Sequence, residues 1–311
     1  MRRSLLAIIL VLAACGGGDD DSTSATSAVE TDESAAPTTA PVAPVESDEC
    51  EDAPDPADYV EGVTPTAIRP CETPTVLQIH PVRSGTGRNA QDGDTIIVDY
   101  VGIRSEDGTI FDESYSRGIP IDFPLGRGGV IQGWDDGLIG SQAGSLVKLD
   151  VPAELAYGET PPGGGVEAGD ALSFLVEVRS VIAPVTAADA PLDLQIEPSI
   201  DATEVTVTEL VAGDGAVAEL GDTAVVHLLI VRGDNQTVVV NTWDESDPVQ
   251  VILADGQTIP GLFEGLPGAR VGSTLVIAMP PELAFGEQGE ATIGLPAGVD
   301  VIAVVEVLGV Y

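Results

Sequence analysis

The sequence contains the same unit twice, and this repetition restricts the folds that the chain can adopt. Three phrases recur: GDTIIVDYVGI (93–103) as GDTAVVHLLIV (221–231), IQGWDDGL (131–138) as IPGLFEGL (259–266), and VPAELAYGE (151–159) as MPPELAFGE (279–287). All three pairs lie 128 residues apart, and the second copy gains one residue only after AFG. A period of this length predicts two tandem domains rather than a stack of short repeats.

Changes in composition mark the boundaries of these domains. A segment rich in Pro, Ala and Asp at 183–201 separates the two copies and is expected to be a linker. The predicted organisation is a leader at 1–15, a disordered tether and neck at 16–72, a first domain at 73–182, a linker at 183–202 and a second domain at 203–311.

Within each copy, the apolar pattern is typical of a β-rich domain. In the first copy, the predicted strands are TVLQIH, DTIIVDYVG, GTIFDES, PIDFPL, SLVKLDVP and ALSFLVEVRSV, with Gly, Pro and Asp between them. Only VIQGWDDGLIGS reads as a helix, and it is short. The pattern predicts the α+β class, with one short helix burying an apolar stripe on a sheet.

The N-terminus resembles a bacterial export signal. Arg2 and Arg3 precede an apolar run at 5–12 that is too short to span a bilayer, and LAAC ends at Cys15. This ending is similar to a lipobox, so Cys15 is expected to carry a lipid that attaches the exported protein to the outer face of the membrane. The alternative is an ordinary signal peptide with a cysteine near its cleavage site. Residues 16–49 hold almost no large apolar side chains and predict a flexible tether.

Two further cysteines, Cys50 and Cys71, lie between the tether and the first patterned segment. An exported protein meets oxidising conditions, so an isolated pair predicts a disulfide. A metal site would need more ligands, and the nearest candidate is the single His80. No metal or cofactor is therefore expected.

Charge and histidine content exclude several kinds of function. The formal net charge is −39 and the pI about 4.1, which argues against nucleic-acid binding because phosphates require a basic face. The two histidines, His80 and His227, leave Ser and Cys side chains without a credible base, so hydrolase chemistry is not expected. The glycine-rich GTGRNA at 85–90 precedes a predicted strand rather than a helix and is interpreted as a turn.

The aromatic residues of the first copy fall in a specific order: DYVG, FDESYSRG, PIDFPLG, VIQGW, AYG and LSFLVEV. This order and spacing over about 74–182 resemble the FKBP-type (macrolide-binding) peptidyl-prolyl isomerase family. The resemblance implies two tandem FKBP-like domains, each an antiparallel half-barrel around one short helix with an apolar pocket between them. It also implies an enzyme that binds Pro-containing polypeptides.

The resemblance assigns roles to individual residues. Trp134 would form the floor of the pocket, the Ile131 N–H and the Tyr157 hydroxyl would each hold a substrate carbonyl, and Asp112 would accept a hydrogen bond at the mouth. Further substrate contacts are expected from Tyr100, Phe111, Arg117, Ile121, Phe123, Val130 and Phe174. Position 121 is often aromatic in the family, and the loop at 161–171 lacks the phrase that is usual there.

The second copy keeps the glycines and the apolar strands but loses these side chains. With the offset applied, the exchanges are Tyr100 to Leu228, Phe111 to Val239, Asp112 to Val240, Arg117 to Glu245, Trp134 to Leu262, Tyr157 to Phe285 and Phe174 to Ala303. We therefore expect the second domain to be a degenerate FKBP-like domain. The alternative is a diverged but active pocket, because Ile259 and Phe285 are retained and backbone donors do not depend on the side chain.

The leading hypothesis is an exported, lipid-anchored prolyl isomerase that helps secreted proteins to fold, with catalysis in the first domain. The alternative is a non-catalytic holdase or scaffold that binds Pro-containing segments. In either case we expect a monomer that meets the membrane only through the Cys15 lipid and binds no nucleic acid.

Overall fold

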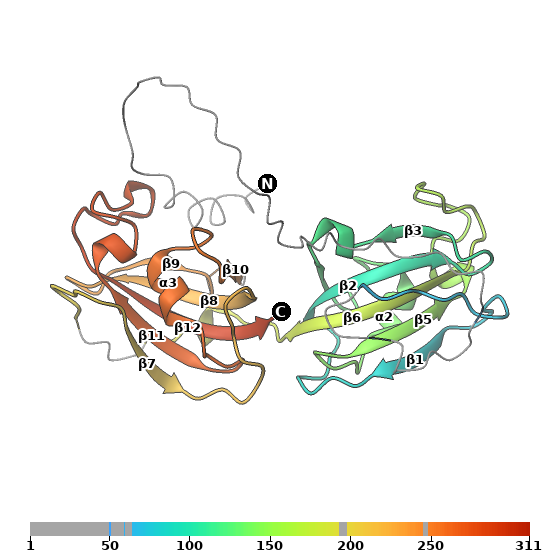
Figure 1. Ribbon diagram of the computed structural model, residues 1–311, viewed down its shortest axis with the longest axis horizontal. Helices are drawn as coiled ribbons and strands as arrows, with labels where there is room; N and C mark the ends of the chain where they lie inside the picture. Colours follow the sequence, from blue (N-terminus) through green and yellow to red (C-terminus); the bar gives the residue numbers. More distant parts are fainter. Residues whose placement is uncertain (1–49, 51–58, 60–63, 193–197, 245–247) are drawn as a thin grey trace, which may run out of the picture.

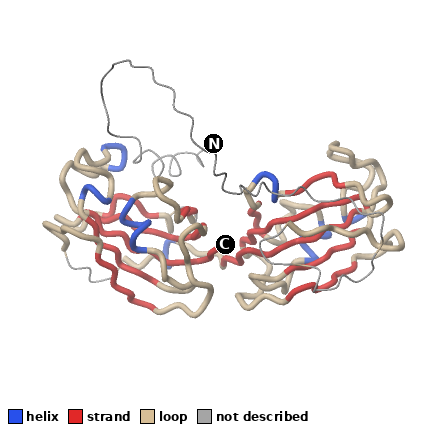
Figure 2. Tube along the Cα trace, viewed as in Figure 1, coloured by secondary structure: helices blue, strands red, loops and turns tan. Residues whose placement is uncertain are grey.

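The computed structural model describes residue 50, residue 59 and residues 64–311 except 193–197 and 245–247 (Figure 1). Two sheets form the framework of the described residues, and the helices among them are few and short (Figure 2). The predicted leader, Cys15 and the tether lie outside the described residues. No helix among the described residues has the length and apolarity that a membrane span requires.

The first domain holds one antiparallel sheet of six strands. The strands are β1 (Gln78–Arg83), β2 (Thr95–Arg104), β3 (Ile110–Glu113), β4 (Ile121–Pro124), β5 (Leu146–Val151) and β6 (Leu172–Ile182). Their order is β1-β5-β6-β2-β3, with β4 also paired to β2. The short helices are α2 (Gln132–Gly137), η2 (Tyr115–Arg117) and η3 (Ala153–Leu155).

The second domain repeats this topology. Its strands are β7 (Thr206–Val211), β8 (Thr223–Arg232), β9 (Val238–Asn241), β10 (Val249–Ile252), β11 (Thr274–Met279) and β12 (Val301–Val310). The order is β10-β8-β12-β11-β7, with β9 also paired to β8. Its helices are α3 (Pro260–Gly265), η5 (Pro281–Leu283) and η6 (Ala291–Ile293), and the linker holds η4 (Ala187–Asp189).

The phrase IxGxxxGL is repeated because its glycines let a helix lie against the sheet. A Cβ at Gly133 would come within 2.4 Å of Val151, and one at Gly137 within 2.9 Å of Leu149, both on β5. In the second domain, Gly261 and Gly265 approach Met279 and Ile277 of β11 in the same way, at 2.5 and 2.9 Å. Any larger side chain at these positions would push the helix away from the strand. The helix therefore packs closely in both copies.

The neck and the linker cover the outer faces of the two sheets. Cys50 and Cys71 are joined by a disulfide, with Cα atoms 4.8 Å apart. Within the loop that the disulfide closes, Tyr59 and Ala67 pack against Val82, Leu146 and Leu175 of the first sheet. On the second sheet, the linker residues Val185 and Ala190 pack beside the buried Trp243.

The two domains meet where β6 and β12 end (Figure 1). Ile97 and Ile182 of the first domain and Val225 of the second are at most 5% exposed and form one apolar cluster, joined by Leu308 and Tyr311. A Cβ at Gly309 would come within 1.9 Å of the Ser180 hydroxyl, so glycine allows this close approach.

The observed elements differ from the predicted ones at a few ends. The first strand begins at Gln78 rather than at Thr75, because 75–76 form a bend and Val76 is 63% exposed. The 3₁₀ turns were not predicted because three-residue elements leave almost no periodic signal. The matched pairing of strands in the two domains follows the offset of 128, which becomes 129 at β12.

Candidate active site

The first domain has an open cavity of about 480 Å³ between the sheet, α2 and the turn at η3. It is lined by Tyr100, Phe111, Asp112, Ile121, Gly129, Val130, Ile131, Gln132, Trp134, Ala156, Tyr157 and Phe174. A volume of this size is typical of small-ligand pockets, which are mostly apolar with a few directed polar groups. The cavity brings together nine of the eleven residues that were predicted for the site.

Trp134 forms the centre of an aromatic cluster at the cavity. It is 4% exposed and lies on the first turn of α2. Its ring centroid is 5.2 Å from that of Tyr100 and 5.2 Å from that of Phe174, with both pairs edge to face. Phe111 contacts Phe174 at 5.7 Å in the same geometry. Edge-to-face contacts fix the orientation of each ring, so the cavity has a preformed shape.

Two predicted contact residues do not line the cavity. Phe123 is 5% exposed and packs behind Trp134, with the ring centroids 5.6 Å apart, because β4 points this side chain into the core. Arg117 lies on η2 and reaches Asp112 from outside. Three lining residues, Gly129, Gln132 and Ala156, were missed. Each is next or near in sequence to a predicted residue and was detectable only as its neighbour.

Three side chains form a hydrogen-bonded group at the cavity mouth. The Tyr100 hydroxyl donates to Asp112, while the Arg117 guanidinium donates to Asp112 Oδ1 at 2.7 Å and to the Tyr100 hydroxyl at 3.2 Å. Burial and the Asp112 hydrogen bond raise the pKa of Tyr100 to about 12. Burial alone would raise the pKa of Asp112, but the bonds from Tyr100 and Arg117 outweigh it and hold that pKa below the ordinary 3.8. At neutral pH the phenol is therefore protonated and the carboxylate charged.

Two donors remain available at the cavity. Ile131 has extended backbone (φ −62°, ψ 148°) immediately before α2, and its N–H donates to no atom of the described residues. Tyr157, at the end of the turn through η3, is 36% exposed. Burial and the negative charge of Asp112 raise the pKa of the Tyr157 phenol, so this hydroxyl is also protonated at neutral pH. Both groups can donate a hydrogen bond to a bound carbonyl.

A buried carboxylate holds the loop in front of α2. Asp135 is 8% exposed, and its two carboxylate oxygens accept the N–H groups of Gly126 and Gly128, each at 2.8 Å. Both glycines have positive φ, at 74° and 69°, which is accessible to glycine at little cost. This loop leads directly to Gly129 and Val130, so Asp135 helps to fix the cavity rim.

The matching positions of the second domain are filled with packed aliphatic side chains. Leu228, Leu262 and Ala303 are at most 2% exposed and belong to one core cluster. Ile259, the counterpart of the half-buried Ile131, is fully buried. Val239, Val240 and Phe285 pack against the same cluster. The counterpart of Arg117, Glu245, lies outside the described residues.

The second domain does contain a tryptophan, but on the opposite face of its sheet. Trp243 matches Tyr115 of the first domain and is fully buried. Its ring stacks on His227 with centroids 4.9 Å apart, beside the linker. The described residues contain no group of three or more His, Cys, Asp or Glu side chains arranged to hold a metal ion.

Comparison with known families and proteins gives a consistent result. The FKBP-type peptidyl-prolyl cis-trans isomerase family matches the chain twice, at 86–179 and 215–308. An FK506-binding protein of Streptomyces anulatus is 42% identical over 111 residues, which are 35% of this chain and 90% of that protein. The isomerase FPR2 of Saccharomyces cerevisiae is 48% identical over 92 residues, covering 30% of this chain and 68% of the relative.

Longer relatives match over both domains. The isomerase FKBP10 of Homo sapiens is 33% identical over 202 residues, 65% of this chain but only 32% of its own length. Among solved structures, FkpA from Escherichia coli is 40% identical with a TM-score of 0.31, covering 34% of this chain and 47% of that one. AtFKBP13 is 34% identical with the same TM-score, over 35% of this chain and 97% of that one. The two family matches together span more than half of the sequence, and the chain therefore belongs to the FKBP-type peptidyl-prolyl cis-trans isomerases, with two tandem FKBP-like domains.

Proposed function

We propose that the chain is an exported, lipid-anchored isomerase that assists the folding of other exported proteins, and that its catalysis takes place in the first domain alone. One observation carries the assignment of catalysis. The first domain has an aromatic cavity of about 480 Å³ with free donors at its rim, whereas Leu228, Leu262 and Ala303 fill the matching space in the second.

The chemistry follows from amide resonance. The barrier to rotation about the X–Pro bond is about 18–20 kcal/mol, because twisting the bond removes resonance. Charge separation in the amide falls at the same time, so an apolar cavity disfavours the planar ground state relative to the twisted state. Trp134 below the proline ring, with Tyr100 and Phe174 beside it, supplies this environment. Acid, base and nucleophile play no part in this mechanism.

Fixed donors add to the effect of the cavity. The Ile131 N–H and the Tyr157 hydroxyl hold carbonyls on the two sides of the twisting bond, and Asp112 faces the mouth in its charged form. Interactions accelerate the reaction only if they are stronger in the twisted state than in the planar one. Each ~1.4 kcal/mol of such preference gives a tenfold rate increase.

A protease-coupled assay on the full-length protein tests this assignment. Trp134→Ala with Tyr157→Phe should lower isomerase turnover at least tenfold. The matched control is Leu262→Ala with Phe285→Leu in the second domain, which should leave turnover within about twofold while that domain remains folded. Equal losses from the two double variants would refute catalysis by the first domain alone. Binding of proline peptides without turnover in the parent protein would favour the holdase alternative.

Export and lipid attachment rest on the sequence at the N-terminus, where LAAC follows a positively charged and apolar leader. Cell fractionation of Cys15→Ser tests the anchor. The variant should move from the membrane fraction to the soluble exported fraction, because Cys15 supplies the only lipid in this proposal. An equally membrane-bound variant would contradict it.

A further inference from the structure

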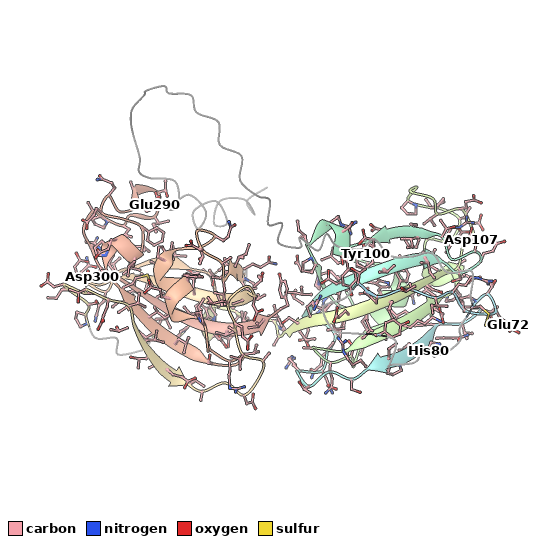
Figure 3. All side chains as sticks on the ribbon, in the orientation of Figure 1. Glu72, His80, Tyr100, Asp107, Glu290 and Asp300 are labelled. Atoms are coloured by element: carbon pink, nitrogen blue, oxygen red, sulfur yellow. A yellow bond between two sulfur atoms is a disulfide. The ribbon has the colours of Figure 1, made fainter. Side chains whose placement is uncertain are left out.

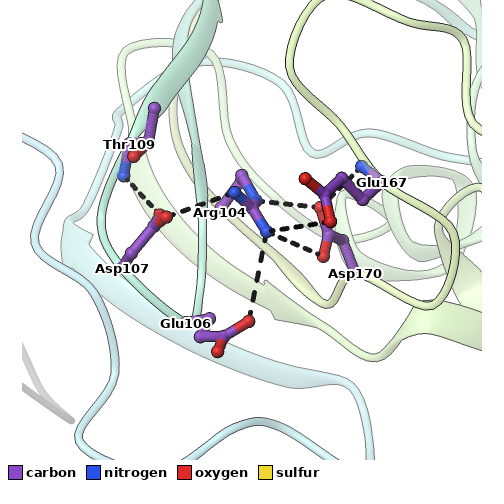
Figure 4. A network of polar contacts seen from close by, with 6 residues as sticks. All are labelled: Arg104, Glu106, Asp107, Thr109, Glu167 and Asp170. Atoms are coloured by element: carbon purple, nitrogen blue, oxygen red, sulfur yellow. Dashed lines mark hydrogen bonds and ion pairs between the residues drawn. The ribbon is translucent and has the colours of Figure 1, made fainter.

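A single arginine joins two loops at one end of the first domain. Arg104 is the last residue of β2 and its side chain is 16% exposed. Its guanidinium donates to both carboxylate oxygens of Asp170, at 2.9 and 3.3 Å, and to Asp107 Oδ2 at 3.2 Å (Figure 4). Glu106 and Glu167 each lie 4.0 Å from it. The Asp170 hydrogen bond and the surrounding carboxylates raise the pKa of Arg104 despite its desolvation.

The two carboxylates bound by Arg104 come from different segments. Asp107 lies in the turn between β2 and β3 and also accepts the Thr109 N–H at 2.9 Å. Asp170 lies immediately before β6 and also accepts the Glu167 N–H at 2.7 Å (Figure 4). A two-oxygen contact between a guanidinium and a carboxylate is among the stronger and more directional ion pairs. Arg104 therefore fixes the chain before β6 relative to the end of β2.

The segment held in this way is the loop that follows the cavity residue Tyr157. Its base is closed by a hydrogen bond from the Gly169 N–H to the Gly158 carbonyl at 2.9 Å. Val166, which is 6% exposed, anchors the middle of the loop in the aromatic core. Gly163, Gly164 and Gly165 at the tip all have positive φ. The loop thus has glycines at its tip that permit several backbone conformations, and a base held by the Arg104–Asp170 ion pair together with the hydrogen bond from the Ser105 N–H to the Ala171 carbonyl at 3.0 Å.

The second domain lacks this connection. Arg232, the counterpart of Arg104, binds Asp234 in its own turn, at 3.0 and 2.7 Å. With the offset of 129, Val299 stands where the first domain has Asp170, and the neighbouring Asp300 accepts the Ala202 N–H and the Ser199 hydroxyl from the end of the linker. Figure 3 labels Asp107, in the turn that Arg104 binds, and Asp300, before β12; the two residues lie at opposite outer ends of the molecule. The arginine reaches across to the loop only in the domain that has the cavity.

We propose that Arg104 is a positioning residue of the isomerase site: through Asp170 it holds the loop at 158–169, and with it Tyr157, over the cavity, and so sets affinity for the prolyl substrate. This proposal rests on catalysis by the first domain. Arg104 itself touches no substrate, and Trp134 and Ile131 are fixed by other contacts. Releasing the loop should therefore weaken substrate binding much more than it slows the isomerisation of the bound substrate.

The experiment uses the full-length protein with Arg104→Ala, Asp170→Asn and the exchange Arg104→Asp with Asp170→Arg. The first two variants should raise KM about threefold or more with kcat changed less than twofold. The exchange variant should recover part of the lost affinity, because it restores an ion pair between the same positions. Arg232→Ala is the matched control and should leave both constants unchanged, since its ion pair is local to the second domain.

A second readout reports on the loop without reference to turnover. Hydrogen exchange of amides at 158–169 should quicken in Arg104→Ala and Asp170→Asn, while exchange in β2 and β6 stays slow. Unchanged KM together with unchanged exchange would overturn the proposal, as would a fall in kcat with KM intact. Failure of the proposed function has a different signature: turnover would survive Trp134→Ala with Tyr157→Phe, whatever the loop does.

Discussion

The two domains share a backbone and differ in what it encloses. Strand pairing, the position of the helix and its two close-packed glycines recur in both, yet one interior is open and the other is filled. The comparison separates two sets of residues. Glycines and alternating apolar strands specify the fold, whereas a few aromatic side chains specify the cavity. The aromatic residues of the cavity can be exchanged for aliphatic ones while the fold is kept.

A polar contact shows that the two domains resemble each other beyond their apolar cores. In the first domain, the Ser114 hydroxyl accepts the Tyr100 N–H at 2.9 Å and donates to Asp99 at 2.6 Å. In the second, Thr242 accepts the Leu228 N–H at 2.9 Å and lies 2.8 Å from His227 Nδ1. The same hydrogen-bonded bridge, from the long strand β2 or β8 to the residue that follows β3 or β9, is thus built from different side chains. This bridge supports the strand whether or not that strand faces a cavity.

The largest expected effect is on the stability of the filled core. Leu262→Ala removes a fully buried side chain and should destabilise the second domain by about 2–5 kcal/mol. Trp134 and Trp243 are the two tryptophans of the chain, one in each domain, so fluorescence in a Trp134→Phe background follows the second domain alone. Denaturant unfolding measures the shift. A much smaller loss of stability would show that the side chains around Leu262 are not closely packed, and the second domain could then no longer be described as filled where the first domain has a cavity.

The disulfide is expected to affect only the first domain. It closes a loop with a sequence separation of 21, for which the chain-entropy model gives a contribution of about 3 kcal/mol. Cys50→Ser with Cys71→Ser should lower the unfolding midpoint followed by Trp134, because Tyr59 and Ala67 in this loop pack on the first sheet. The Trp243 signal should not move. A shift of both signals would show that the domains unfold as one unit.

Removing the shared polar bridge should cost the two domains similar amounts. Ser114→Ala and Thr242→Val each leave a buried strand N–H without its partner, which costs about 1–3 kcal/mol. Each change should shift only its own tryptophan signal in denaturant unfolding. If Thr242→Val were silent while Ser114→Ala was costly, the bridge would serve the cavity rather than the fold.

The smallest expected effect is the pH dependence that Tyr100 and Asp112 give to the stability of the first domain. Because the folded pKa of Tyr100 is raised to about 12, its contribution to stability is complete below the ordinary value of 10 and is lost as the pH rises towards 12. The lowered pKa of Asp112 acts in the opposite direction: its contribution is present above 3.8 and is lost as the pH falls through the lowered value. Stability from this group should be constant between these limits.

Ultraviolet titration of the phenols, with Tyr100→Phe as the difference, should place the ionisation of Tyr100 near pH 12. The second domain has Leu228 and Val240 at these two positions, but burial also raises the pKa of its Tyr311 to about 12, so the difference made by Tyr100→Phe isolates the contribution of the first domain. A Tyr100 that ionises near pH 10 would show that neither burial nor the hydrogen bond to Asp112 acts on this phenol in solution.

The repeated phrases were sufficient to predict two α+β domains, because glycines and alternating strands act locally. Most cavity residues were predicted through family resemblance, since a pocket assembled from β2, β3, α2 and β6 leaves no local pattern. Phe123 was expected at the substrate and lies in the layer behind Trp134, because the sequence does not show which face a strand residue takes. Asp170 was not found for a related reason: its partner Arg104 lies 66 residues away, and pairing across that distance follows from strand order.

The strand order also governs when each domain can close as the chain is made. β6 lies between β5 and β2, and β12 lies between β11 and β8, so in both domains the central strand is the last to be synthesised. Until residues 172–182 arrive, the inner edges of β2 and β5 have no strand to pair with, which is the condition under which unpaired edges associate wrongly. Each domain must therefore form in one late step, and a chain that stops before its last strand leaves two halves of a sheet with nothing between them.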